Sequence, residues 1–382
     1  MMNEDIRALF PITKDYVYLN HAAIAPYSIP VSSVLHTLVN DITNHGSVNW
    51  HNWLEVLNST RKIAAELVGA KIGTIAFVRN TSDGLSVVAN GIDWQQGDNV
   101  VSCDIEFPAN IYPWMNLQKR GVELRLAHAE GGRIEPEAVF GLVDERTKVI
   151  SLSWVQYSSG FRADLRSIGR FCRERDLLFV VDAIQGLGAL KLDVEADYVD
   201  AFAADAHKFL MGPEGVGLLY MSERAMARVT PSIVGWLSVK DWWNCFNEEY
   251  DYKIEFPPNA LRFECGTPNT LGIHGTYAAI DLIMKIGSQE IENYLIDFGY
   301  TLRKELEEIG FETFVPKSRQ EASAIVCCRH PNSKPEELYR KLSEKKIITA
   351  ARCGWLRVSP HFYNNTSDID KLINTLAKLT SR

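Results

Sequence analysis

Short apolar runs alternate with amphipathic stretches through the middle of the chain. Residues 164–176 place Leu165, Ile168 and Phe171 on one side of a helical pattern, as expected for a helix that covers a sheet. Near-continuous apolar strands alternating with such helices are typical of a mainly parallel sheet with both faces covered. The strand-like runs in this region are residues 75–78, 99–102, 148–152, 177–181 and 216–220.

The pattern changes on both sides of this region. Residues 50–67 form an amphipathic helical pattern, whose apolar stripe we assign to the core. Residues 236–258 are aromatic and irregular, which predicts a packed loop that either lines the pocket of a partner subunit or belongs to the core of a dimer. Residues 273–309 then predict a long helical region. The remaining elements form an α+β pattern, with strands at 322–327 and 356–359 and helices at 335–345 and 367–378.

The length of the chain predicts two domains. A chain of 382 residues exceeds one hydrophobic core, and 46% apolar residues can fill two. We expect a large domain of residues 15–255 with the mainly parallel sheet. A smaller C-terminal α+β domain would contain residues 256–382 together with residues 1–14.

Charge and cysteine usage narrow the class of partner. A net charge of -8 without a dense Lys/Arg run argues against nucleic-acid and membrane-surface binding, and favours small molecules and a second copy as partners. The seven scattered cysteines lack CxxC spacing, which predicts reduced, mostly buried thiols and no metal site. Residues 1–14 have no apolar targeting segment, and no run of residues is long and apolar enough for a membrane span. We therefore expect a cytoplasmic protein.

Lys208 is the strongest candidate for chemistry. It follows the strand-like stretch 199–204 and precedes the glycine-rich segment 212–217. A lysine at the mouth of a buried strand loses solvent, which lowers its pKa and makes its amine a nucleophile for a carbonyl such as that of pyridoxal phosphate. Taken alone, a lysine after a strand is more often an ordinary surface residue.

Polar residues at the end of strand 177–181 add a second candidate group. Asp182 lies where this strand emerges at its carboxyl end, the usual ligand crevice of a parallel sheet. A buried carboxylate there can keep the ring nitrogen of pyridoxal phosphate protonated, and Gln185 can bond its phenolic oxygen. The alternative is that Asp182 caps a following helix.

Three further segments suit the same ligand. Residues 80–84 open a helical stretch at 85–90, which makes either an anion site or a plain helix cap. Phe107 follows a strand end and can stack on a flat ring, although a core or surface phenylalanine is the simpler interpretation. Arg357 on a strand-like run can bind a substrate carboxylate in bidentate fashion, or form a structural ion pair.

Together, in their order along almost the whole chain, these motifs resemble the class V aminotransferase family of fold type I pyridoxal phosphate enzymes. That family includes cysteine desulfurases, selenocysteine lyases, isopenicillin N epimerase and kynureninase. The resemblance implies an aspartate-aminotransferase-like α/β fold, a homodimer with shared active sites, and an aldimine between the cofactor and Lys208. It also implies that Thr267 reaches the phosphate of the partner subunit. The implied cofactor-binding residues are Thr81, Ser82, Phe107, Asp182, Gln185, Asp205, His207 and Thr267, and the implied substrate-binding residues are Arg357, Asn20 and His21.

Four positions depart from the desulfurase pattern. Phe107 replaces a histidine that serves in proton transfer, and Cys353 lies only four residues before Arg357, too close for the desulfurase nucleophile. We interpret Cys353 as structural or incidental. Tyr157 stands in place of an asparagine, and Asp205 in place of a phosphate-binding Ser or Thr. A carboxylate there repels a phosphate unless it turns away or bonds to His207.

These departures favour an aminotransferase or an epimerase-like enzyme in which Lys208, once freed, shuttles the Cα proton of an amino acid. A cysteine desulfurase, selenocysteine lyase or other C–S lyase is the first alternative. A non-catalytic protein that keeps the fold for binding is the second. A nicotinamide-binding enzyme is disfavoured, because no GxGxxG follows the first strand.

Overall fold

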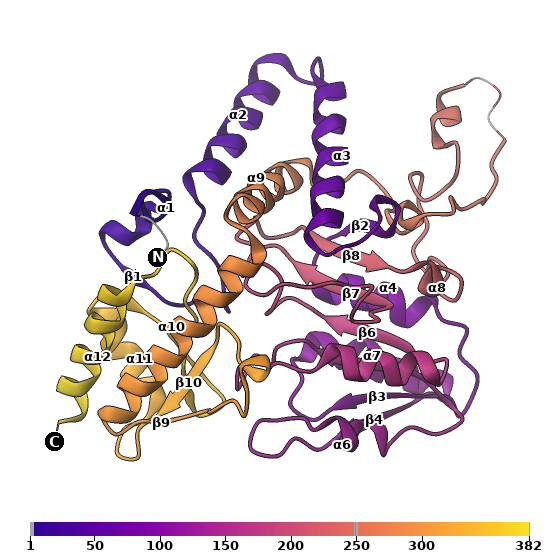
Figure 1. Cartoon of the computed structure of the whole chain (residues 1–382). Helices are drawn as coiled ribbons and strands as arrows, with labels where there is room; N and C mark the ends of the chain where they lie inside the picture. The colour runs from indigo at the N-terminus through magenta and orange to yellow at the C-terminus, as the bar shows by residue number, and fades with distance from the viewer. Residues whose placement is uncertain (1–3, 248, 250, 382) are drawn as a thin grey trace.

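A seven-stranded sheet lies at the centre of the computed structural model, which describes residues 4–247, 249 and 251–381 (Figure 1). The strand order is β2-β8-β7-β6-β5-β3-β4, and β8 alone runs antiparallel to its neighbours. The strands are β2 (Ile75–Val78), β3 (Asn99–Cys103), β4 (Glu123–Ala127), β5 (Thr147–Ser153), β6 (Leu178–Asp182), β7 (Ala201–Asp205) and β8 (Gly217–Met221).

The predicted mainly parallel sheet is confirmed, and every predicted strand of this region is present with its ends shifted by no more than two residues. The sequence pattern missed β4. Its residues Glu123 and Arg125 are charged, and much of the strand is exposed at the sheet edge. An edge strand therefore lacks the continuous apolar run that marks the buried strands.

Alternation along the strands divides the buried core between the two sheet faces. Val180 and Val181 of β6 belong to different apolar clusters, because successive side chains of a strand point to opposite faces. The cluster of Val181 includes residues of α3, α7 and α9, and that of Val180 includes residues of α4, α5 and α8. Both faces are thus covered, as predicted. These helices are α3 (Trp50–Leu67), α4 (Thr81–Gly91), α5 (Tyr112–Met115), α7 (Leu165–Glu174), α8 (Glu223–Met226) and α9 (Thr270–Ile286).

The C-terminal part of the chain forms a second, antiparallel sheet of order β12-β13-β10-β9. Its predicted α+β pattern is confirmed, although the strand expected at residues 322–327 forms at β10 instead. The elements are α10 (Ser288–Glu308), β9 (Glu312–Thr313), β10 (Val326–Arg329), α11 (Pro335–Glu344), β12 (Ala350–Arg352), β13 (Trp355–Val358) and α12 (Thr366–Thr380).

The start of the chain pairs with its C-terminal part. Near the N-terminus, β1 (Val17–Tyr18) pairs in parallel with β11 (Ile347–Ile348), beside the second sheet.

The helical region predicted at 273–309 is two helices, because Gly287 between α9 and α10 has a φ of 99° that ends the first. Helix α9 packs against α3 and against α2 (Ile29–His45), which joins it to the large sheet. The division at residue 255 stays a prediction. The remaining short helices are α1 (Glu4–Ala8) and α6 (Pro136–Phe140).

The aromatic segment after β8 projects from the body of the protein (Figure 1). It contains a short turn of 3-10 helix at Trp242–Phe246, and its contact with the body includes an edge-to-face packing of Trp243 on Trp50. Much of the segment does not pack on its own chain, since Phe246 and Tyr252 are 70% and 89% exposed, and its packing on a partner subunit stays a prediction. Tyr250 lies outside the described residues. No helix in the described part of the chain is both long and apolar enough to cross a membrane.

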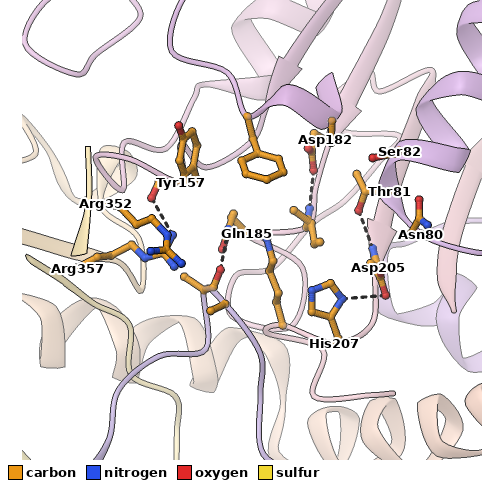
Figure 2. Close-up of a pocket in the computed structure, with 16 residues that line it drawn as sticks. Asn80, Thr81, Ser82, Tyr157, Asp182, Gln185, Asp205, His207, Arg352 and Arg357 are labelled. Carbon is orange, nitrogen blue, oxygen red and sulfur yellow. Dashed lines mark hydrogen bonds and ion pairs between the residues drawn. The ribbon is translucent and has the colours of Figure 1, made fainter. Parts of the chain in front are cut away.

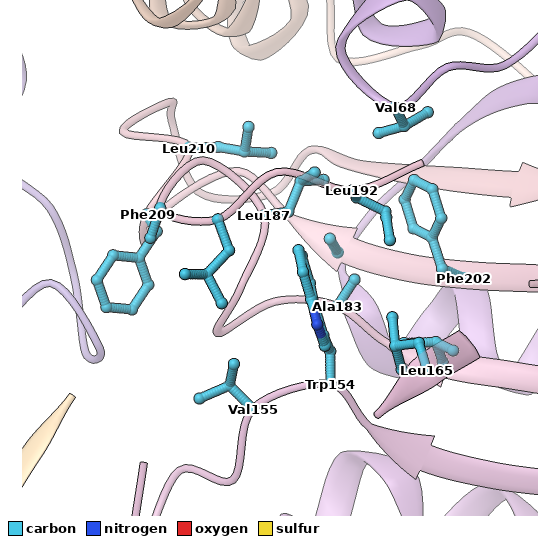
Figure 3. Close-up of a cluster of buried hydrophobic side chains, with 14 of the residues drawn as sticks. Val68, Trp154, Val155, Leu165, Ala183, Leu187, Leu192, Phe202, Phe209 and Leu210 are labelled. Carbon is cyan, nitrogen blue, oxygen red and sulfur yellow. The ribbon is translucent and has the colours of Figure 1, made fainter. Parts of the chain in front are cut away.

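A glycine holds the loop that follows β7 against the apolar layer drawn in Figure 3. Gly188 has a φ of 97°, and a Cβ on it would lie 2.2 Å from the carbonyl oxygen of Phe209. Phe209 is fully buried in this layer and directly follows Lys208. The position of Lys208 therefore depends on close backbone approach at a residue without a side chain.

We expect Gly188→Ala to destabilise the protein by more than about 3 kcal/mol, because it adds a backbone clash to the strain of a left-handed residue. Gly46→Ala is the matched control. Gly46 has a φ of 57° with nothing within 4 Å of its Cβ position, so the substitution costs only the backbone strain, about 1 kcal/mol. Thermal unfolding of both variants measures the difference, and equal Tm values contradict the assigned clash.

Candidate active site

The carboxyl ends of the central strands converge on a cavity of about 350 Å³ (Figure 2). Parallel strands bring their carboxyl ends to one edge of a sheet, which is why segments distant in sequence meet there. The cavity is lined by most of the predicted cofactor and substrate residues: Thr81, Ser82, Phe107, Asp182, Gln185, Asp205, His207, Lys208 and Arg357.

Three predicted site residues lie outside this cavity. Thr267 is exposed and lines a separate cavity near the N-terminal end of α4. His21 is fully buried, and its ring nitrogens lie 3.1 Å from the carbonyl oxygen of Ser359 and 3.0 Å from the hydroxyl of Tyr363. Asn20 forms a backbone bridge with Ser359, while its Oδ1 is buried without a hydrogen-bond partner among the described residues. The cavity wall beside them is formed by Ala22 and Ala23.

Lys208 lies in the floor of the cavity beneath an aromatic ring. Its Nζ is 5.6 Å from the centroid of the Phe107 ring. Burial lowers the pKa of Lys208 to about 8, and the nearby Asp182 carboxylate limits this change. The neutral amine, which is the state in which nitrogen attacks a carbonyl, is therefore far more populated near physiological pH than in an ordinary lysine.

Asp182 is the buried acid at the end of β6. Its Oδ1 accepts a hydrogen bond of 3.1 Å from the backbone nitrogen of Ile184. Burial raises the pKa of Asp182 to about 7, and the neighbouring Glu106 acts in the same direction. The alternative that Asp182 caps a helix is wrong, because no described helix lies between β6 and β7. This carboxyl instead suits a cationic partner, which favours its ionised form.

Glu106 is a buried acid that the sequence reasoning missed. Its Oε1 accepts hydrogen bonds from the backbone nitrogen of Ser153 at 2.7 Å and from Nε2 of Gln156 at 2.8 Å. Its Oε2 accepts a third from the hydroxyl of Ser153. These bonds tie the loop after β3 to the end of β5 and so fix the adjacent Phe107. The available signal was an acid one residue before the predicted stacking ring.

The N-terminus of α4 faces the opposite end of the cavity. The Asn80 side chain accepts a 2.9 Å hydrogen bond from the backbone nitrogen of Asp83, so the helix-cap interpretation is correct. Thr81 Oγ1 accepts a 3.0 Å bond from the backbone nitrogen of Asp205, which joins the helix start to the end of β7. The capped helix still presents its positive end and the hydroxyl of Ser82 to the cavity, as an anion site requires.

Asp205 and His207 lie together beside this helix end. The Oδ1 of Asp205 is 3.0 Å from Nδ1 of His207 (Figure 2). This proximity gives the carboxylate a cationic neighbour whenever the imidazole is protonated. If a phosphate lies nearby, Asp205 must either turn away or bond to His207, and the contact with His207 meets that requirement.

Arg357 reaches the cavity from β13 of the second sheet. Its guanidinium is buried and donates a 3.1 Å hydrogen bond to the backbone oxygen of Tyr157. Burial lowers the pKa of Arg357 to about 10. The structural ion pair is wrong as an alternative, since no acid among the described residues lies within ion-pair distance of this side chain. Arg352 of β12 also lines the cavity, although no sequence motif selects it.

Two buried polar atoms that belong to residues lining the cavity, Gln185 Oε1 and Arg357 Nε, have no partner within the described residues. Buried polar groups are normally hydrogen-bonded, so these atoms indicate a polar ligand. Pyridoxal phosphate fits them. Asp182 suits its ring nitrogen, Phe107 its ring face, the start of α4 its phosphate, and Lys208 its carbonyl carbon.

Comparison with known proteins agrees with this arrangement. The sequence model of the family described as aminotransferase class-V matches residues 17–372. A probable cysteine desulfurase of Methanothermobacter thermautotrophicus is 30% identical, covering 99% of this chain and 98% of that protein. An uncharacterized aminotransferase of Schizosaccharomyces pombe is 28% identical, covering 91% of this chain and 89% of its own length.

Solved structures share the fold. The apo structure of a cysteine desulfurase from Thermococcus onnurineus NA1 superposes with a TM-score of 0.88 at 24% identity, covering 100% of this chain and 98% of that one. A variant of C-DES with glycine covalently linked to its PLP cofactor gives a TM-score of 0.89 at 22% identity, covering 97% and 98% of the two chains. The predicted fold class is therefore confirmed.

The lowered pKa of Lys208 predicts how cofactor uptake depends on pH. The neutral fraction of the amine rises as pH rises through the pKa, so the rate of covalent attachment to the apo-protein should climb up to about pH 8 and then level off. Stopped at intervals with borohydride, the reaction measures attachment at Lys208. The exposed Lys71, whose pKa its ion pair with Glu223 raises, is an internal control that stays unmodified. A rate still rising steeply near pH 10 contradicts the assigned environment.

Proposed function

The chain belongs to the class V aminotransferase family, and from this premise we propose that it catalyses transamination of an α-amino acid through Lys208. The family match confirms the resemblance noted in the sequence and the assignment of a pyridoxal phosphate-dependent enzyme. One observation carries the proposed chemistry. A single cavity contains the Lys208 amine, whose pKa is lowered, and the buried carboxyl of Asp182. It also contains the buried guanidinium of Arg357, which forms no ion pair with a described acid.

Each of these groups has a distinct task in the proposal. Arg357 binds the substrate carboxylate with a charge that no described acid neutralises, which orients Cα toward the cavity floor. The bound cofactor supplies an electron sink for the charge that develops at Cα. Lys208, whose lowered pKa leaves part of the amine neutral near physiological pH, accepts the Cα proton at Nζ and later returns it at another atom. Phe107, whose ring centroid is 5.6 Å from Nζ, holds the cofactor ring in place by stacking on its face.

Transamination needs one base that moves between two atoms, whereas epimerisation needs a second acid–base group at Cα. Tyr157 is the nearest candidate at the substrate end, because it lines the cavity beside Arg357. Burial and a contact with Cys353 raise the pKa of Tyr157 to about 12, so at neutral pH it can donate a proton to Cα but cannot accept one, whereas reversible epimerisation needs both. This environment supports transamination over an epimerase-like reaction.

A C–S lyase is the second candidate, and a contact at the cavity mouth favours it. The Sγ of Cys353 lies 3.4 Å from the hydroxyl of Tyr157, at an exposed turn between β12 and β13. Proteins similar to this chain are named as cysteine desulfurases, and one is described as the cystine C–S lyase C-DES. Sulfide release from cysteine measures this activity, and comparison with Cys353→Ser tells whether the thiol takes part.

We also propose that two chains form a homodimer with shared active sites. Thr267 is exposed in a cavity of its own, together with Arg79 at the start of α4. Thr267 does not line the Lys208 cavity of its own chain, which supports a role toward the phosphate in the partner subunit. The cytoplasmic location stays a prediction.

Lys208→Ala tests the assigned role. We expect wild-type protein to be yellow, to hold the cofactor after borohydride treatment, and to convert an amino acid to its oxo acid in a single turnover. The retained amino group should then pass to an added 2-oxo acid. Lys208→Ala should hold no reducible cofactor and should lose roughly 100- to 10,000-fold in rate.

The matched control is Lys71→Ala, which removes an exposed lysine far from the cavity. It should keep both the colour and the rate. A colourless wild-type protein that takes up no cofactor contradicts the proposal. Continuous release of sulfide without transfer of the amino group would replace transamination by the lyase reaction.

A further inference from the structure

Two arginines share one face of the β12–β13 hairpin at the cavity mouth. Arg357 pairs directly with Ala350 across the two strands, and Arg352 lies two residues further along β12. Side chains alternate along a strand, so Arg352 and Ala350 face the same side, and directly paired residues share a face. Diagonal neighbours in such a pair are about 7–8 Å apart. Figure 2 shows both side chains at the same end of the cavity.

Neither guanidinium is neutralised by the protein within the described residues. Both side chains donate hydrogen bonds to backbone oxygens, Arg352 to that of Ala351 at 2.8 Å and Arg357 to that of Tyr157 at 3.1 Å. Neither Arg352 nor Arg357 forms an ion pair with an acid in the described part of the chain. The Nε of Arg357 is buried and has no acceptor at all among these residues. The pair therefore keeps most of its donors for a ligand.

The distribution of charge makes this end of the cavity strongly positive. Arg352, Arg357 and Lys208 all line it, and Arg352 lowers the pKa of the other two by repulsion. The two cavity acids serve other ends. Asp182 lies by Ile184 at the ring position, and Asp205 lies beside His207 at the helix end.

A substrate with a single carboxylate satisfies Arg357 and leaves the second guanidinium without an anion. Arg357 is buried, so it suits the α-carboxylate next to the reacting carbon. Arg352 is exposed at the mouth, where the far end of a substrate side chain would lie.

We propose that Arg352 is a specificity-determining residue that binds a second anionic group on the substrate side chain, so that the enzyme prefers acidic α-amino acids. This inference rests on the proposed function and names its substrate class. The second anion is carried by a short side chain, as in aspartate, or by a longer one, as in glutamate or 2-aminoadipate. A series of these three amino acids identifies the chain length.

Isosteric pairs of amino acids test the charge directly. The ratio of kcat/KM for aspartate over asparagine, and for glutamate over glutamine, should exceed roughly 10-fold for at least one pair, as expected for a charge-assisted bond. Arg352→Gln should bring that ratio toward one, and Arg352→Lys should restore part of it. Arg340→Gln removes an exposed arginine on α11 and should keep the wild-type ratio.

Calorimetry of the cofactor-loaded protein gives a readout that needs no turnover. Succinate and butyrate have the same number of carbons and differ by one carboxylate. Succinate should bind wild-type protein roughly 10-fold more tightly than butyrate, and Arg352→Gln should abolish this difference. A kcat/KM ratio close to one for both isosteric pairs in the wild-type enzyme would overturn the proposal. So would a preference for acidic substrates that survives in Arg352→Gln.

The failure of this inference differs from the failure of the proposed function. If the enzyme transaminates neutral and acidic amino acids equally, only the role of Arg352 is wrong. If no amino acid changes the visible spectrum or yields an oxo acid, the proposed function is wrong, while succinate binding still reports on the arginine pair.

Discussion

The site depends on the electrostatic interaction between the buried Asp182 carboxyl and the buried Lys208 amine. Burial raises the pKa of the acid and lowers that of the amine, while each charge limits the change in the other. Both groups therefore titrate near neutral pH, where neither is held firmly in one state. Pyridoxal phosphate suits both, because its ring nitrogen offers Asp182 a proton partner and its carbonyl offers Lys208 an electrophile.

The fold maintains this interaction by fixing the ends of separate strands. Glu106 bonds the loop after β3 to β5, which places the Phe107 ring above Lys208. Gly188 lets the loop that follows β7 pack tightly at Phe209. The second sheet then brings Arg357 to the same cavity from the other side. The acid and the amine come from the large sheet, and the substrate anchor comes from the C-terminal sheet.

Much of this arrangement could be predicted from the sequence, because buried parallel strands and helix starts leave local patterns. Asp182 and Lys208 follow apolar runs, and Thr81 lies at a recognisable helix start. The edge strand β4 escaped because exposure removes the apolar signal. Glu106 and Arg352 escaped for another reason. The role of Glu106 depends on a contact with Gln156, which is distant in sequence, and that of Arg352 depends on the register of the β12–β13 hairpin, which no sequence motif marks.

Titration of the apo-protein with pyridoxal phosphate, comparing wild type with Asp182→Asn across pH, tests the central claim most directly. The account predicts that Asp182→Asn weakens cofactor binding about tenfold or more at neutral pH and moves the pH midpoint of covalent uptake below that of wild type. Asp98→Asn, at a buried acid paired with Arg146 and Lys148, should leave both quantities unchanged. Equal affinities and midpoints for Asp182→Asn and wild type would contradict the account.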